Sequence, residues 1–114
     1  MDIDSETEKK IHELQIIEQN LQALLMQKQA IQLEENEAAS AISELKKTSD
    51  EVYRIIGGIM VKSEKSVLLS ELEEKKKILE LRVSTLEKQE KISGDKAEKL
   101  RKSISDALSE IKKH

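Results

Sequence analysis

The chain has 114 residues, of which 38% are charged and 37% apolar, and its net charge is −3 with both signs intermixed. Tyr53 is the single aromatic residue, so a compact core built on large rings is excluded. The charge balance provides no basic field for nucleic acid, and the lack of cysteine excludes disulfides and Cys-based zinc sites. Proline is absent and only three glycines occur, so long uninterrupted helices are expected.

The first predicted helix covers residues 5–48. Ser5 and Glu8 have the spacing of a capping box, with Ser5 as the N-cap. Apolar residues then follow a heptad pattern, with d at position 3 and a at position 7, each repeated every seven residues. A disordered chain, which high charge would also allow, has no need of such periodicity. The exceptions on this seam of a and d positions are Thr7, Lys10, Lys28 and Glu35.

A β-hairpin is predicted over residues 51–63. β-branched residues stand on both sides of Gly57-Gly58, and a two-residue type I′ turn needs a positive φ at both central positions. Both faces of this hairpin are apolar. A lone two-stranded ribbon is only marginally stable in water, so we expect another element or chain to cover or extend it.

The second predicted helix covers residues 66–113, with a start at Ser63 or Ser66. Its heptad phase passes unchanged from Leu86 through Ser93 to Leu100, so we expect one continuous helix that tolerates Gly94 at a cost of about 1 kcal/mol. The polar exceptions on its seam are Lys76, Glu90 and Ser93.

The two helices are expected to pair with each other. If facing residues have numbers that sum to 114, every layer joins an a to a d position and no layer holds two charges. Glu35 and Lys76 then lie in adjacent layers on opposite helices, as do Lys28 and Glu90. A parallel homodimer would stack each of these charges on its own copy, which is destabilising. The predicted fold is therefore all-α, a long antiparallel two-helix coiled coil with a short β-hairpin at the bend, forming one unit over residues 1–114.

Several apolar residues lie off this seam. We expect most of them to widen it, except at the free ends of the helices, where Ile11 and Leu108 are left uncovered. Apart from those ends, no accessible apolar surface is expected once the hairpin is covered. The apolar residues off the seam are Ile11, Ile16, Leu25, Leu33, Ile78, Leu81, Ile92 and Leu108.

The chain resembles the prefoldin family, and specifically its β-type subunits. The specific part is the hairpin motif V-Y-x-I-x-G-x-I-x-V-K between two equal arms, supported by LQALLMQKQ at residues 21–29 and LEKQE at residues 86–90. A single hairpin resembles β-type subunits, since α-type subunits carry two. The resemblance implies a hexamer of two α-type and four β-type subunits that captures unfolded proteins at the arm ends and delivers them, without nucleotide, to a group II chaperonin.

Two sets of residues are predicted to carry this function, and the first drives oligomer assembly. Its members belong to the hairpin: Val52, Tyr53, Ile55, Ile56, Gly57, Gly58, Ile59, Met60 and Val61. The second set binds clients at the free ends of the arms, where the outermost seam layers are weakest: Ile3, Ile11, Leu14, Ile104, Leu108 and Ile111.

No catalytic constellation, metal site or cofactor site is expected. His12 beside Glu13 has no second internal His or Cys to complete a site, and the longest apolar run, residues 55–61, is far shorter than the roughly 20 residues of a membrane span. The acidic N-terminus is unlike a secretory signal, so we expect a soluble, cytoplasmic, ATP-independent chaperone subunit. The alternative is a static coiled-coil scaffold or adaptor.

Overall fold

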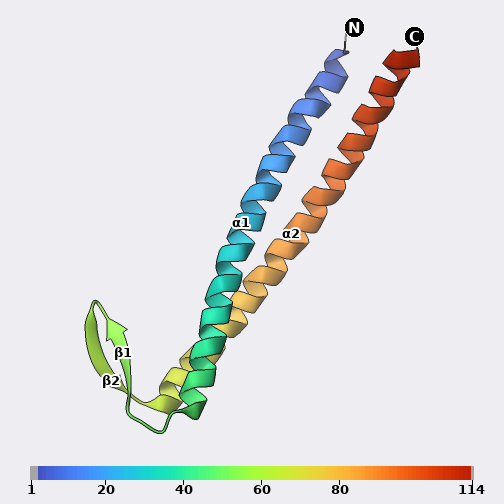
Figure 1. The fold of residues 1–114 in the computed structure, drawn as a ribbon. Coiled ribbons are helices and arrows are strands. Elements are labelled where there is room, and N and C mark those ends of the chain that lie inside the picture. The colour runs from blue at the N-terminus through green and yellow to red at the C-terminus, as the bar shows by residue number, and fades with distance from the viewer. Residues whose placement is uncertain (1–2, 114) are drawn as a thin grey trace. The chain divides into compact units, whose positions relative to one another are not determined.

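The computed structural model describes residues 3–113 and contains two helices and one hairpin (Figure 1). Helix α1 spans Ser5–Lys47, strands β1 and β2 span Val52–Ile56 and Ile59–Ser63, and helix α2 spans Lys65–Lys113. The two strands pair antiparallel in a two-stranded sheet. The predicted fold class is thereby confirmed.

The chain forms two compact units. Unit 1 comprises Met1–Lys28 and Thr85–His114, and unit 2 comprises residues 29–84. In unit 1 the first part of α1 lies antiparallel to the last part of α2, so the start of α1 and the end of α2 meet at one end of the unit (Figure 1). We call these two helix termini the free ends. Unit 2 contains the end of α1, the hairpin and the start of α2.

The N-cap of α1 is Asp4, and the prediction of Ser5 is wrong by one residue. The backbone N–H of Thr7 donates to Asp4 Oδ1 at 2.7 Å, and the N–H of Glu8 donates to the Asp4 carbonyl at 3.1 Å. These are the bonds of an N-cap residue, and Ser5 is already helical. The hydrogen bond from Thr7 lowers the pKa of the Asp4 carboxyl, because it stabilises the charged form. An acidic group also suits a helix N-terminus better than a hydroxyl does.

Helix α2 is continuous through Gly94, as predicted. It begins at Lys65, between the two predicted starts, and the N–H of Leu68 donates to the Glu64 carbonyl at 3.0 Å. The Lys65 ammonium donates to the Thr48 carbonyl at 2.8 Å. One of the carbonyls exposed at the end of α1 is thus satisfied by the start of α2.

The predicted seam is where the structure buries its side chains. Every seam residue from Thr7 to Ile111 is buried or half-buried, and only Ile3 is exposed. Ala97 has no exposed surface, but among the described residues no large side chain is completely buried. The core is therefore a single thin stripe. Its buried residues are Thr7, Leu86, Ala97 and Ile104 in unit 1, and Ile31, Ala38, Ile42, Leu79 and Val83 in unit 2.

Most apolar residues off the seam do not widen it, which corrects the expectation. Ile11 is half-buried, and Leu25 and Leu108, at 36% exposure, flank the seam. The others lie at heptad positions c and f, which point away from a single partner helix. They are between 46% and 68% exposed: Ile16, Leu33, Ile78, Leu81 and Ile92. Accessible apolar surface therefore exists beyond the hairpin and the free ends.

One of the two predicted cross-helix ion pairs forms. Lys28 Nζ lies 2.7 Å from Glu90 Oε1, with both side chains mostly buried, and this contact raises the pKa of Lys28. The same Glu90 oxygen makes no hydrogen bond of good geometry to any described group, so its burial depends on the Lys28 charge. Lys76 instead lies 3.9 Å from Glu80 on its own helix, and no ion pair joins it to Glu35 in the described structure. That prediction is wrong.

Gly94→Ala should stabilise the protein by about 0.5–1 kcal/mol, because alanine loses less backbone entropy in a helix. A Cβ atom at Gly94 would meet nothing within 4 Å. Gly57→Ala is the matched control: its Cβ is equally free, but its φ of +55° should make the same change destabilising by about 1–2 kcal/mol. Urea unfolding followed by circular dichroism measures both. A loss of stability in Gly94→Ala would contradict the prediction.

Lys28 and Glu90 should be energetically coupled, and Glu35 and Lys76 should not. A double-mutant cycle with Lys28→Met and Glu90→Gln is expected to show favourable coupling, since either single change leaves one mostly buried charge or polar group without its partner. The same cycle with Glu35→Gln and Lys76→Met is the control and should give zero coupling within error. Equal coupling energies in the two cycles would refute the assignment.

Candidate protein-interaction sites

The hairpin of unit 2 has a register centred on its two glycines. Ile56 faces Ile59, Ile55 faces Met60, Arg54 faces Val61 and Val52 faces Ser63. Gly57 and Gly58 have φ of 55° and 80°, as the predicted turn requires.

Both faces of the hairpin carry exposed apolar side chains. Side chains alternate across a strand and cross-strand partners share a face. One face therefore holds Tyr53, Ile55 and Met60, of which Ile55 is 74% and Met60 70% exposed. The other holds Val52, Arg54, Ile56, Ile59 and Val61, with Ile56 and Ile59 at 56% and 66% exposure. Two faces of this kind, with unpaired strand edges beside them, form a surface suited to other strands.

Arg54 links the hairpin to α2 within unit 2. Its guanidinium binds the Glu71 carboxylate of α2 through two contacts, Nη2–Oε2 at 2.8 Å and Nη1–Oε1 at 3.4 Å. A paired contact of this type constrains orientation as well as distance. The face that carries Arg54 is thus turned toward α2 at its base, and the face with Tyr53, Ile55 and Met60 is turned away.

Glu51 joins both strands at the base of the outward face. Its carboxylate accepts a hydrogen bond from the Tyr53 hydroxyl at 2.7 Å and lies 3.0 Å from Lys62 Nζ. Tyr53 and Lys62 are cross-strand partners, so this contact ties them together. The hydrogen bond from Tyr53, with that from Lys62, lowers the pKa of Glu51, and the same bond raises the pKa of Tyr53.

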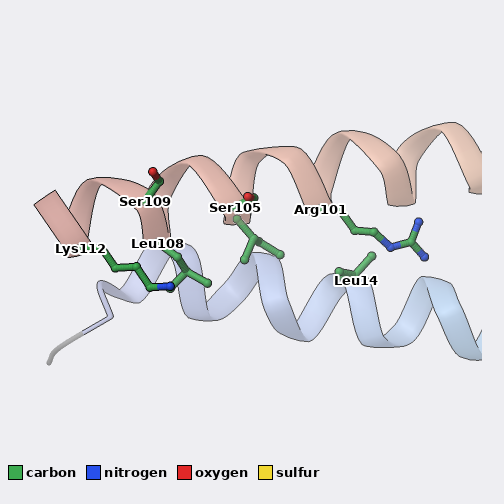
Figure 2. A pocket seen from close by; sticks show the side chains of 7 residues that line it. Leu14, Arg101, Ser105, Leu108, Ser109 and Lys112 are labelled. Carbon is green, nitrogen blue, oxygen red and sulfur yellow. The ribbon is translucent and has the colours of Figure 1, made fainter.

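At the free ends in unit 1, a groove runs between the two helices (Figure 2). We call it the end groove. Leu14 comes from α1, and the other lining residues come from α2. Leu108, Lys112 and Arg101 reach toward α1, and Leu14 points up toward α2 (Figure 2). The lining residues are Leu14, Arg101, Ile104, Ser105, Leu108, Ser109 and Lys112.

Three of the six residues predicted to bind clients meet in the end groove: Leu14, Ile104 and Leu108. Ile3, Ile11 and Ile111 do not line it, although Ile3 is exposed and the other two are half-buried. Ile104 is only 9% exposed, so a ligand touches its edge unless the helix ends separate. Lys10 Nζ also donates to Ser103 Oγ at 2.8 Å beside this layer and links the two helices there.

Sequence reasoning missed the polar part of the end groove. Arg101 and Lys112 were not among the predicted site residues, yet both line it. The available signal was their heptad position: Arg101 and Leu108 are both e positions, beside the seam residue Ile104. Placing a groove on that side also required knowing which residues of α1 lie opposite.

Residues 3–113 contain no group of three or more His, Asp or Glu side chains arranged to hold a metal ion. No helix in that range is long and apolar enough to cross a membrane.

Comparison with known proteins gives one consistent answer. The sequence profile described as "Prefoldin subunit" matches residues 8–110. Prefoldin subunit beta of Thermococcus onnurineus is 39% identical over 98 residues, 84% of each chain. That of Methanothrix thermoacetophila is 34% identical over 108 residues, 93% of this chain and 90% of the relative. The crystal structure of the prefoldin beta subunit from Thermococcus strain KS-1 superposes with a TM-score of 0.88 at 35% identity, covering 94% of this chain and 96% of that one.

Proposed function

Because this chain belongs to the prefoldin family of chaperone subunits, we propose that it holds unfolded proteins at the free ends of its two helices. In the same proposal, the β-hairpin joins it to α-type subunits in a hexamer of two α and four β subunits. The bound clients then pass to a group II chaperonin without ATP.

The observation that carries the client-binding part is the end groove. Leu14, Ile104 and Leu108 form an apolar floor that solvent reaches, at the terminus of a helix pair held by a thin seam. Apolar contact is non-directional, so it suits unfolded chains that share no sequence but expose hydrophobic side chains. Helix ends also open at low free-energy cost, which would enlarge the surface toward Ile3, Ile11 and Ile111.

Assembly with other prefoldin subunits would supply the avidity that a single groove lacks. A single groove of this size offers little area and binds weakly, whereas several chains on one body raise the effective concentration of binding sites around a bound client. The hairpin supports this role, because its exposed apolar faces and strand edges are stabilised only when another chain covers them. We assign assembly to the hairpin residues predicted from sequence, with Arg54 and Glu71 setting their direction.

Ile56→Lys combined with Ile59→Lys should prevent assembly and leave the helices intact. These two residues are cross-strand partners at the exposed tip of the hairpin, so the change costs little in the isolated chain but places two charges in the interface. Native mass spectrometry with an α-type subunit measures the complex. The matched control is Leu33→Lys with Ile78→Lys, two residues of unit 2 with similar exposure on the outer helix faces. A full-size complex from the hairpin variant would exclude this interface.

Leu108→Ser combined with Ile111→Ser should abolish or strongly reduce protection of an unfolded client. The assembled complex is mixed with a chemically unfolded enzyme, and light scattering follows aggregation in the absence of ATP. Ile78→Ser with Ile92→Ser is the control, because these residues are more exposed than Leu108 but lie on the outer face of α2. Protection lost only in the control would move the client site to the outer face, and a wild-type complex without protection would favour the static scaffold.

A further inference from the structure

We propose that the end groove selects client segments in which several apolar side chains are flanked by carboxylates. This inference rests on the proposed function, since it names the class of segment that the groove takes. The ligand in question is a stretch of unfolded polypeptide with aliphatic residues bordered by Asp or Glu.

The first observation is the composition of the lining. Three aliphatic residues form the floor, two cations and two serines complete the groove, and no carboxylate of residues 3–113 lines it. This is contrary to the chain as a whole, which has 23 acidic and 20 basic residues. Glu18 pairs with Arg101 from outside the lining, but the lining itself carries two positive charges and no negative one, so it is complementary to an acidic segment.

The second observation is the placement of the two cations along the groove. Figure 2 shows Arg101 beside Leu14 toward one end of the groove and Lys112 beside Leu108 toward the other. Arg101 and Lys112 stand eleven residues apart on α2, about 16 Å at 1.5 Å per residue, so an extended segment along the groove can place aliphatic side chains on Leu14 and Leu108 and a carboxylate beside each cation. A small anion would use only the cations, and an uncharged apolar segment would use only the floor.

The third observation is that both cations remain able to bind a carboxylate. Arg101 Nη2 lies 3.6 Å from Glu18 Oε1, and both side chains are about half exposed. This is longer than a charge-assisted hydrogen bond of about 2.7–2.9 Å, so the pair is loose and a client carboxylate can share or replace Glu18. Lys112 is exposed, and no described carboxylate forms an ion pair with it.

The test uses three fluorescent peptides with the same leucine-rich centre and flanks of Asp, Asn or Lys. Binding to the assembled full-length protein is measured by fluorescence anisotropy at low and high salt. The Asp-flanked peptide should bind about three- to tenfold more tightly than the Lys-flanked one, because each partly exposed charge pair contributes modestly. Salt should remove this difference and leave binding of the Asn-flanked peptide unchanged.

Variants assign the preference to the groove. Arg101→Gln with Lys112→Gln should abolish the preference and retain binding of the Asn-flanked peptide. Lys99→Gln with Lys102→Gln removes the same charge from exposed positions of α2 outside the groove and should change nothing. Glu18→Gln frees Arg101 and should increase the preference. A preference that is absent, or equally reduced by the control pair, overturns the proposal.

The outcomes separate this inference from the proposed function. If all three peptides bind equally and Leu108→Ser with Ile111→Ser weakens all of them, the client site stands and the charge selection falls. If none of the peptides binds, or if the Leu108 and Ile111 changes leave binding intact, the client site itself lies elsewhere.

Discussion

The rest of this structure depends on one constraint: two helices can bury only the stripe that each presents to the other. The seam residues fill that stripe, and even there only Ala97 is completely covered. Apolar residues at the e positions that flank the seam, such as Leu25 and Leu108, remain partly exposed, and those at c and f positions are exposed to solvent. Each apolar residue outside the seam is therefore either a tolerated exposure or a contact for another chain. In a compact globular domain the same residues would be buried and carry no such information.

A thin seam also makes its polar members important. Lys28 and Glu90 interrupt the apolar stripe at the boundary of unit 1, where each charge is compensated by the other across the helices. A shifted register would separate them and leave both mostly buried without partners, which is costly. Lys76 reaches Glu80 on its own helix, and the energy of a pair within one helix does not depend on which residues of the other helix lie opposite. Of the two charge pairs predicted from the seam, only Lys28–Glu90 therefore contributes to register specificity in the described structure.

The features that sequence predicted well are those fixed by periodicity or by backbone conformation. The heptad phase placed every seam residue except Ile3 and carried α2 through Gly94, and the need for two positive φ angles identified the turn at Gly57 and Gly58. The sequence did not predict features that depend on choosing between two adjacent residues, or on which residues from other elements lie nearby in space. Asp4 and Ser5 are both good N-caps, and only geometry separates them. The Arg54–Glu71 contact joins residues 17 apart on different elements, and the cations of the end groove require knowing which side of the seam opens.

The two candidate interaction surfaces differ in a way that matches the different tasks proposed for them. The hairpin has apolar side chains on both faces and unpaired strand edges, and the Arg54–Glu71 contact holds it in one direction. An exposed apolar surface whose orientation is already restricted favours a long-lived complex, because less conformational entropy is lost on binding. The end groove is small, one-sided and flanked by loosely held charges, so a client would bind there weakly and dissociate readily. Several weakly binding end grooves give high avidity only when they are held on one body, and the hairpin is the surface that would hold them together. Client capture at the free ends therefore presupposes assembly at the hairpin, and loss of the hairpin contacts should remove both functions at once.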